Sequence, residues 1–299
     1  MAEKPMPPPQ EPRGLDMGDL DHATPEEIAA FREYYTRMQG RPHEGWQFFL
    51  ENNPSAMKRW RLYADYVAIP FNQWLILTAT DFANAAWYAQ LGFADGIRYV
   101  VYIQQTSGRF SREQVCEGLG ISLYYGGPPG GEAIAAALRD YEWRAPAEPI
   151  DLSGWNTSRH LISSGLDFTN TRLSPDELEM LEAWYLGAIG EVPGYVRFFA
   201  KHRPEALKAH RNRYENLVRT LPVQLLPLAA IKISMYRSQP AELRENVLLA
   251  RYLGVSKADT LLTAMSGLLY GNVGTASMLE SVAGDVFDEE WPAAAPPAG

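Results

Sequence analysis

The stretch SPDELEMLEAWYLGAIGEVPGYVRFFAKHRPEALKAH, residues 174–210, decides the fold class of this chain. It opens with Ser174-Pro-Asp-Glu, a hydroxyl cap, a first-turn proline and two acids suited to the positive end of a helix. Apolar residues then recur at helical spacing up to Gly190, a typical stop. Arg203-Pro204-Glu205 begins another helix. The stretch therefore predicts helices and no strand.

A second version of this stretch lies 150 residues earlier. Thr24–Val67 aligns without a gap with the segment that begins at Ser174, and about ten positions are identical. A second block, Phe110–Gly126, matches Val255–Gly271 at an offset of 145. Two blocks in the same order indicate a tandem duplication.

The rest of the chain is read around these two repeats. Leu221–Ser234 is largely apolar and predicts a buried helix, and Glu242–Tyr252 and Ser256–Tyr270 follow it, separated by Gly254. We expect an all-α protein of two tandem helical bundles related by pseudo-symmetry. The expected parts are a disordered arm at 1–23, the first repeat at 24–143, a linker at 144–173, the second repeat at 174–288 and a loose tail at 289–299.

The composition narrows the class of protein. The 299 residues carry a net charge of −9, which argues against a general nucleic-acid binder because no broad basic field can hold phosphates. No apolar run reaches about 18 residues, so no membrane partner is expected. The start lacks the apolar core of a secretory signal, and a single cysteine, Cys116, excludes an internal disulfide. A cytoplasmic location is the simplest prediction.

Three segments of the second repeat carry a resemblance to a known family. They are EVPGYVRFFAKHRPEALKAH from Glu191, LPVQLLPLAAIKIS from Leu221, and the Ala-x-x-x-Gly-Val-Ser that begins at Ala250. The chain resembles the carboxymuconolactone decarboxylase / alkylhydroperoxidase D-like family over about 173–288, and over about 24–143 by way of the repeat. The resemblance implies a compact helical bundle that forms homo-oligomers, either trimers or hexamers.

The residues that carry the family's chemistry are replaced here. Peroxidase members have a helix glutamate followed by CxxCxxxH; aligned on Ala250 and Gly254, these fall at Pro227, Gln239, Glu242 and Asn246. None is a thiol, so thiol–disulfide peroxidase chemistry is excluded. Decarboxylase members place an acid and a histidine on this helix; Glu242 matches the acid, and Asn246 replaces the histidine.

Two groups of polar residues are candidate sites. The catalytic candidates are Glu242, which would transfer protons, and Asn246 and Gln239, whose amides would hold an oxyanion. The candidates for substrate binding are Tyr236, His210, Trp87, Tyr88, Gln90 and Asp81. The alternative for Glu242 and Asn246 is a solvated helix start, and the alternative for the basic stretch around His210 is a solvated helix face.

Other motifs point to structure. The glycines of Tyr124-Tyr-Gly-Gly-Pro-Pro-Gly-Gly131 lack the lysine and hydroxyl of a phosphate loop and predict a break between helices. Cys116 and the pairs Phe48-Phe49 and Phe198-Phe199 are expected to be buried. No His, Asp and Glu group has metal-ligand spacing, and no cofactor motif occurs.

Three functions stay open. The first is a decarboxylase, lyase or lactone-acting enzyme that performs non-redox acid/base chemistry on a small organic acid or aromatic-derived compound. The second is a non-catalytic helical binding module or partner subunit. The third, a thiol antioxidant enzyme, would need Cys116 to act alone with an outside thiol. An enclosed, partly polar pocket at Glu242 or Trp87 would favour the first over a scaffold.

Overall fold

The chain is all-α, as predicted, in a computed structural model that describes residues 14–39, 42–68, 74–146, 148–152 and 159–291. No strand occurs among these residues. The helices of the first half are α1 (Pro25–Gln39), α2 (Glu44–Asn52), α3 (Pro54–Ala68), α4 (Trp74–Gln90), α5 (Ala94–Thr106) and α6 (Arg112–Leu138). The helices of the second half are α7 (Pro175–Ile189), α8 (Gly194–His202), α9 (Pro204–Glu215), α10 (Leu225–Arg237), α11 (Pro240–Tyr252), α12 (Lys257–Ser266) and α13 (Val273–Asp288).

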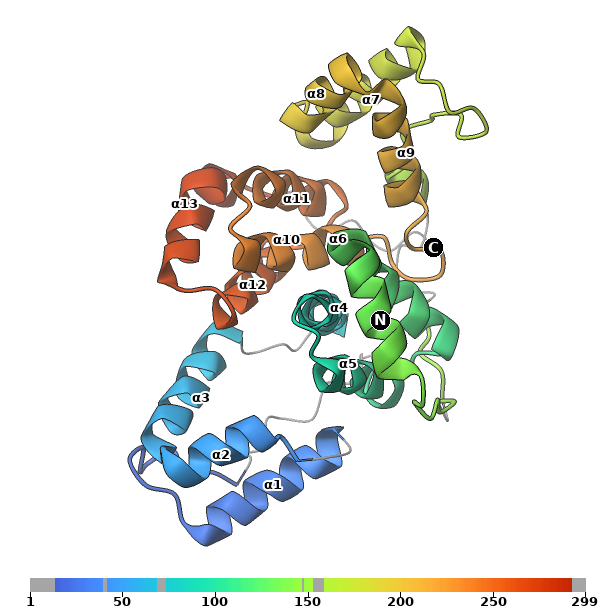
Figure 1. Ribbon diagram of the computed structural model, residues 1–299. Helices are drawn as coiled ribbons and strands as arrows, with labels where there is room; N and C mark the ends of the chain where they lie inside the picture. Colours follow the sequence, from blue (N-terminus) through green and yellow to red (C-terminus); the bar gives the residue numbers. More distant parts are fainter. Residues whose placement is uncertain (1–13, 40–41, 69–73, 147, 153–158, 292–299) are drawn as a thin grey trace.

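The centre of the molecule is built from both halves of the chain. Figure 1 shows α4 end-on in the middle, with α5 and α6 on one side and α10 to α13 on the other. Helix α4 presents buried Ala79, Ala83 and Ala86, small residues that let α10 and α6 approach closely. At Gly118 of α6, a Cβ atom would lie 2.0 Å from the ring of Phe82, so this contact requires glycine.

Three-helix groups lie at the two ends of the molecule (Figure 1). Helices α1–α3 enclose a separate small core around Phe31, Tyr35 and Leu50. The apolar residues of α7–α9, such as Leu181 and Leu207, belong instead to the main core. Helix α3 also contacts α12, from the other half of the sequence.

The same buried ion pair occurs in both end groups. Lys58 Nζ lies 2.7 Å from Glu27 Oε1, and Lys208 Nζ lies 2.6 Å from Glu177 Oε1. Each glutamate also accepts the backbone N–H of the residue that caps its helix, Thr24 or Ser174. The lysine therefore joins the third helix of each group to the N-terminus of the first, and the capping acid serves two purposes.

Two glycines break the helices where the sequence indicated. Gly190 ends α7 with φ of 77°, in the left-handed region that favours glycine. Gly127, with φ of 62°, interrupts α6 within the Gly-Gly-Pro-Pro motif and confirms the predicted break.

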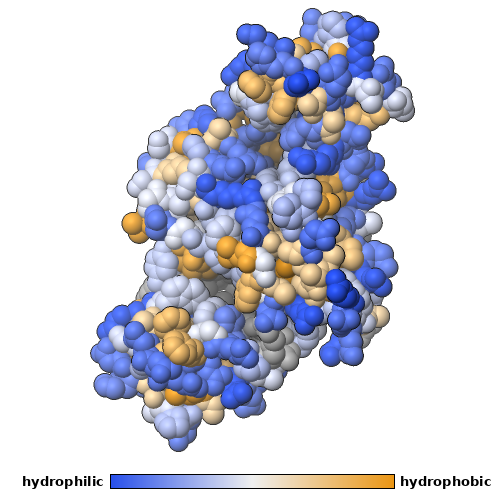
Figure 2. Space-filling model, in the orientation of Figure 1, coloured by the Kyte–Doolittle hydropathy of each residue, from blue (hydrophilic) through white to orange (hydrophobic). Residues whose placement is uncertain are grey.

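Four residues expected to be buried are exposed. Cys116 is exposed on α6, and Phe48 and Phe198 are 59% and 60% exposed on α2 and α8. Phe49 is exposed as well. Both helices are only nine residues long and lie on the surface of the end groups, so a single face of each reaches the core. Figure 2 shows an apolar patch over the N-terminal end group, at the lower left.

The arm expected at the N-terminus is only partly described. Residues 1–13 lie outside the described residues, whereas Leu15 is buried and Lys58 Nζ donates to the carbonyl of Asp16 over 2.8 Å. Residues 292–299 of the tail also lie outside, and Trp291 Nε1 donates to the Val286 carbonyl. None of the described helices combines the length and apolarity needed to cross a bilayer.

Candidate functional site

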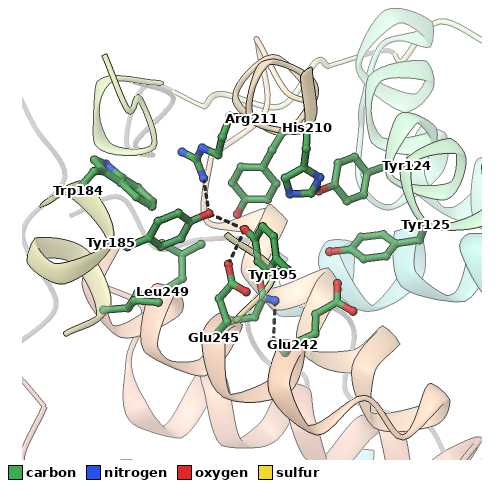
Figure 3. A pocket seen from close by; sticks show the side chains of 13 residues that line it. Tyr124, Tyr125, Trp184, Tyr185, Tyr195, His210, Arg211, Glu242, Glu245 and Leu249 are labelled. Carbon is green, nitrogen blue, oxygen red and sulfur yellow. Dashed lines mark hydrogen bonds between the residues drawn. The ribbon is translucent and has the colours of Figure 1, made fainter. Parts of the chain in front are cut away.

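A partly enclosed cavity of about 50 Å³ lies where α7, α8 and α9 meet α6 and α11 (Figure 3). A volume of this size holds several waters or part of a small organic molecule. Its walls are mostly aromatic, with two carboxyl groups. The lining residues are Tyr124, Tyr125, Trp184, Tyr185, Ile189, Tyr195, His210, Arg211, Tyr214, Glu242, Glu245, Asn246 and Leu249.

Helix α11 supplies the acids. Glu242, Glu245, Asn246 and Leu249 are spaced by three and four residues, so they share the face that α11 turns to the cavity. The Asn246 side chain donates to the backbone carbonyl of Glu242 over 2.8 Å. This bond holds Asn246 against its own helix, and the amide hydrogen that makes it is not directed at a substrate.

A chain of hydrogen bonds leads from Glu245 to a buried arginine (Figure 3). Tyr195 donates its hydroxyl to Glu245 Oε1 over 3.3 Å, and the hydroxyls of Tyr185 and Tyr195 are 2.5 Å apart. Arg211 Nη1 donates to the Tyr185 hydroxyl over 3.1 Å. Helices α7, α8, α9 and α11 each contribute one member, so their packing fixes the position of the carboxyl.

Arg211 is itself held from behind. Its Nε donates to Glu215 Oε1 over 3.0 Å, and its Nη2 donates to the Ile162 carbonyl over 2.8 Å. Ser164 donates both its hydroxyl and its backbone N–H to the same Glu215 oxygen. The guanidinium lies 4.4 Å from the centroid of the Trp184 ring. The positive charge of Arg211 is therefore balanced by Glu215, outside the cavity lining.

The environment shifts the protonation of the lining groups. Burial, together with the neighbouring Glu242, raises the pKa of Glu245 to about 7. Burial also raises the pKa of Glu242, against the opposing effect of Arg237. Burial and the charges of Arg211 and Arg213 lower the pKa of His210 to about 4, so this imidazole is neutral at pH 7. Glu245 thus exchanges a proton near neutral pH.

The remaining hydroxyls are arranged around His210. Tyr124 Oη lies 3.4 Å from the His210 ring nitrogens, a long hydrogen bond. Arg213 stacks over the Tyr124 ring at 4.1 Å. Tyr214 is 8% exposed, and its buried hydroxyl has no hydrogen-bond partner among the described residues. A bound molecule or water would supply the missing partner.

The cavity gathers three of the residues predicted from the sequence. Glu242, Asn246 and His210 line it. Gln239 precedes α11 as its N-cap residue, and its Oε1 is buried without a hydrogen-bond partner, but it does not line the cavity. Tyr236 donates its hydroxyl to the Ala83 carbonyl over 3.1 Å and is committed to the α4–α10 contact.

The candidates from the first repeat lie elsewhere, around a buried lysine. The ring centroids of Trp87 and Tyr236 lie 4.7 Å apart with the rings tilted, and the Tyr88 hydroxyl pairs with that of Tyr270 at 2.9 Å. Lys232 Nζ lies 5.2 Å from the Tyr270 ring centroid and fills the space between the helices. Gln90, at the end of α4, is exposed.

Asp81 and Lys232 are two buried titratable groups of this second region, and each favours the charged form of the other; Lys232 Nζ has no hydrogen-bond partner among the described residues. Asp81 accepts a hydrogen bond from Gln104 Nε2 over 2.7 Å. Burial raises the pKa of Asp81 to about 7 and lowers that of Lys232 to about 7, each against the attraction of the other. The pair stands in the contact between α4 and α10, apart from the cavity.

Sequence reasoning missed Glu245 and its partners Tyr195, Tyr185 and Arg211. One signal was present: Glu245 stands three residues after Glu242 and four before Leu249, on the same helix face. Tyr185 belonged to the helical apolar spacing and Arg211 to the basic stretch around His210, and neither was a candidate for the site. Their separation of 26 positions along the chain gave no indication that their side chains meet.

The described residues contain no group of three or more His, Cys, Asp and Glu side chains that could hold a metal ion. The chain matches no protein-family model, no curated protein and no solved structure.

Proposed function

We propose that the protein is a carboxymuconolactone decarboxylase-like enzyme that performs non-redox acid/base chemistry in this cavity. The substrate is a small organic acid or an aromatic-derived compound, and the reaction is a decarboxylation, an elimination or an opening of a lactone. The observation that carries the proposal is the position of Glu245, a buried carboxyl that titrates near neutral pH at the end of a fixed hydrogen-bond chain.

Glu245 takes or gives the proton in this scheme. Its pKa of about 7 leaves both protonation states populated at neutral pH, which suits a general acid or base. Glu242 is the second carboxyl of the cavity, and its negative charge favours the protonated form of Glu245. Tyr195 orients the carboxyl, because its hydroxyl in turn is fixed by Tyr185.

The tyrosines supply neutral hydrogen-bond donors for charge that develops on a substrate oxygen. Burial raises the pKa of Tyr125 and of Tyr214 well above its usual value, so both hydroxyls keep their protons. The Tyr214 hydroxyl is uncommitted among the described residues and is the best placed to donate to a substrate oxygen. This replaces the oxyanion role expected of Asn246 and Gln239.

A test combines a substrate panel with carboxyl variants. The protein is incubated in D₂O with small aromatic acids, lactones and phenols, and ¹H NMR follows deuterium incorporation and product formation. Glu245→Gln removes the proton-transfer group and should lower the rate by about 10²–10⁴-fold. Glu280→Gln, at an exposed position of α13, is the matched control and should leave the rate unchanged. A rate that survives Glu245→Gln would remove Glu245 from the mechanism.

A non-catalytic binding module is the second candidate, and the size of the cavity favours it. About 50 Å³ leaves little room for a substrate to change shape. Saturable binding of a compound without any chemical change over days, in both the parent protein and Glu245→Gln, would support this reading against the enzyme.

The homo-oligomer and the cytoplasmic location belong to the same proposal. Exposed phenylalanines on α2 and α8 offer apolar surface for contact between copies. Light scattering of the full chain gives the number of subunits, and a monomer at all concentrations would contradict the proposed assembly.

A further inference from the structure

The charges around the cavity do not balance. Two carboxyl groups, Glu242 and Glu245, belong to its lining. The one lining cation that stays charged, Arg211, is already paired with Glu215, and the His210 imidazole is neutral at pH 7. Among its lining residues the cavity therefore has more carboxyl groups than uncommitted cations, although Arg237, outside the lining, also attracts Glu242.

The walls are suited to a cation as well. Five of the lining side chains are tyrosines and one is tryptophan, and the faces of such rings attract positive charge. The wall already does so for its own arginine: the Arg211 guanidinium lies 4.4 Å from the Trp184 centroid and 5.4 Å from that of Tyr214.

An independent feature indicates a polar ligand. The Tyr214 hydroxyl belongs to a side chain that is more than nine-tenths buried, lines the cavity and has no hydrogen-bond partner among the described residues. A buried hydroxyl without a partner is costly, so a molecule that exchanges a hydrogen bond with it gains affinity. An ammonium group can donate to this oxygen and to the carboxylates at once.

We infer that the cavity binds a small protonated amine that carries a compact apolar or aromatic group. The ammonium is held by Glu242 and Glu245, and the apolar part lies against the tyrosine rings and Leu249. The inference rests on the proposed function, since it uses the same cavity, and it narrows the substrate to an amine rather than an organic acid. A carboxylate would meet two carboxyls and no free cation in the lining.

Binding of a cation and ionisation of the carboxyls support each other. The charged and titratable groups that face Glu245 are Glu242 on α11, Tyr185 and Glu191 on and after α7, Tyr195 on α8, His210, Arg211 and Tyr214 on α9, and Tyr124 and Tyr125 on α6. A bound ammonium favours the charged form of Glu245 and so lowers its pKa. Affinity should therefore rise as the pH rises through about 7, by about tenfold between pH 6 and pH 8 if a single proton is displaced.

Three probes of the same shape test the charge preference: benzylamine, benzyl alcohol and benzoate. Calorimetry and ¹H NMR titration of the full chain at pH 6 and pH 8 give the affinities. Benzylamine should bind at least tenfold more tightly than the other two at pH 8, and its binding should release a proton at pH 7. Glu245→Gln and Glu242→Gln should each weaken it by at least fivefold, whereas Glu280→Gln should leave it unchanged.

Opposite results overturn the inference. Tighter binding of benzoate than of benzylamine, or amine affinity that falls as the pH rises, would show that the cavity selects anions. Amine affinity unchanged in both glutamine variants would place the amine elsewhere. The probe comparison in the parent protein needs no variant, so it stands even if a variant fails to fold.

The two proposals fail separately. Turnover of an organic acid that depends on Glu245 would keep the proposed function and overturn the amine preference. Benzylamine bound in the cavity, with no chemistry on any compound of the panel, would do the reverse.

Discussion

The two end groups, α1–α3 and α7–α9, share a framework and differ in what it encloses. Both carry the buried lysine–glutamate pair, Lys58 with Glu27 and Lys208 with Glu177, at equivalent positions of the aligned sequences. In the first group the aromatic rings pack on one another: Trp46 lies 4.9 Å from Tyr35 and 5.2 Å from Trp60. In the second, Tyr185 and His210, which align with Tyr35 and Trp60, line the cavity.

Several aligned residues differ between the packed aromatic core of α1–α3 and the cavity side of α7–α9. At the offset of 150 residues, Gly45, Trp60 and Ala64 stand where the second group has Tyr195, His210 and Tyr214. The facing helix differs too, because α11 brings Glu242 and Glu245, while the acid of α5 is Asp95 in its first turn. The same ion pair thus occurs in both groups, and different side chains at the aligned positions accompany a packed core in one and a cavity in the other.

The largest expected effect comes from Arg211→Met, which removes a buried cation of the end group α7–α9. Glu215 would stay buried without its cation, and the Ile162 carbonyl and Tyr185 hydroxyl would lose a donor. The free energy of unfolding should fall by about 3–5 kcal/mol in urea titrations. Arg213→Met, which removes an exposed guanidinium stacked on Tyr124, is the control and should cost less than about 1 kcal/mol. Equal costs for the two variants would contradict the buried network.

The shared ion pair is tested by Lys208→Met and Lys58→Met, made separately. Each leaves a capping glutamate without a charged hydrogen-bond donor, so each should lower the free energy of unfolding by about 2 kcal/mol. Urea titration of both variants compares them directly. A difference of more than about 1 kcal/mol would show that the two pairs are alike in geometry but not in energy.

Glu245→Gln sharpens the comparison because it removes one of the two carboxyl groups from the cavity beside α7–α9. The pKa of Glu245 is about 7 in the folded protein against 4.5 for an unperturbed glutamate, so between these values the folded chain binds a proton that the unfolded chain lacks. The parent protein should therefore lose stability as the pH rises through this range, by on the order of 3 kcal/mol. The glutamine variant keeps an acceptor for Tyr195 and should escape this loss. Thermal unfolding at pH 4 and pH 8 checks it: the two proteins should match at pH 4, and the variant should be the more stable at pH 8.

The smallest effect is expected from Phe48→Ser and Phe198→Ser. Both rings are about 60% exposed in the folded protein. Unfolding therefore exposes little additional apolar surface at either position. Each change should alter the free energy of unfolding by no more than about 0.5 kcal/mol. A larger loss that depends on protein concentration would reveal that the rings lie in a contact between copies.

The sequence alone indicated that the chain is helical and where several helices begin or end, although the helix predicted at Leu221–Ser234 runs from Leu225 to Arg237. Proline and capping acids at helix starts, glycine at Gly190 and Gly127, and apolar spacing are local signals, because each acts through hydrogen bonds and backbone angles within a few residues. The likeness of the end groups was also visible, since an aligned pair such as Lys58 and Lys208 needs only a comparison of letters. Glu242 and Asn246 were named as candidates because they fall at motif positions of the family that the chain resembles, and His210 because it stands in a basic stretch.

Only the tertiary structure decided which of those candidates meet. The chain from Arg211 through Tyr185 and Tyr195 to Glu245 joins four helices, and no local pattern records which side chains converge across helix contacts. Burial was decided in the same way: Cys116 and Phe198 have apolar character but lie on outer faces, while Lys208 and Arg211 are charged and lie inside. Exposure and pKa depend on everything that surrounds a residue in space, and the linear order of the chain does not contain that information until it folds.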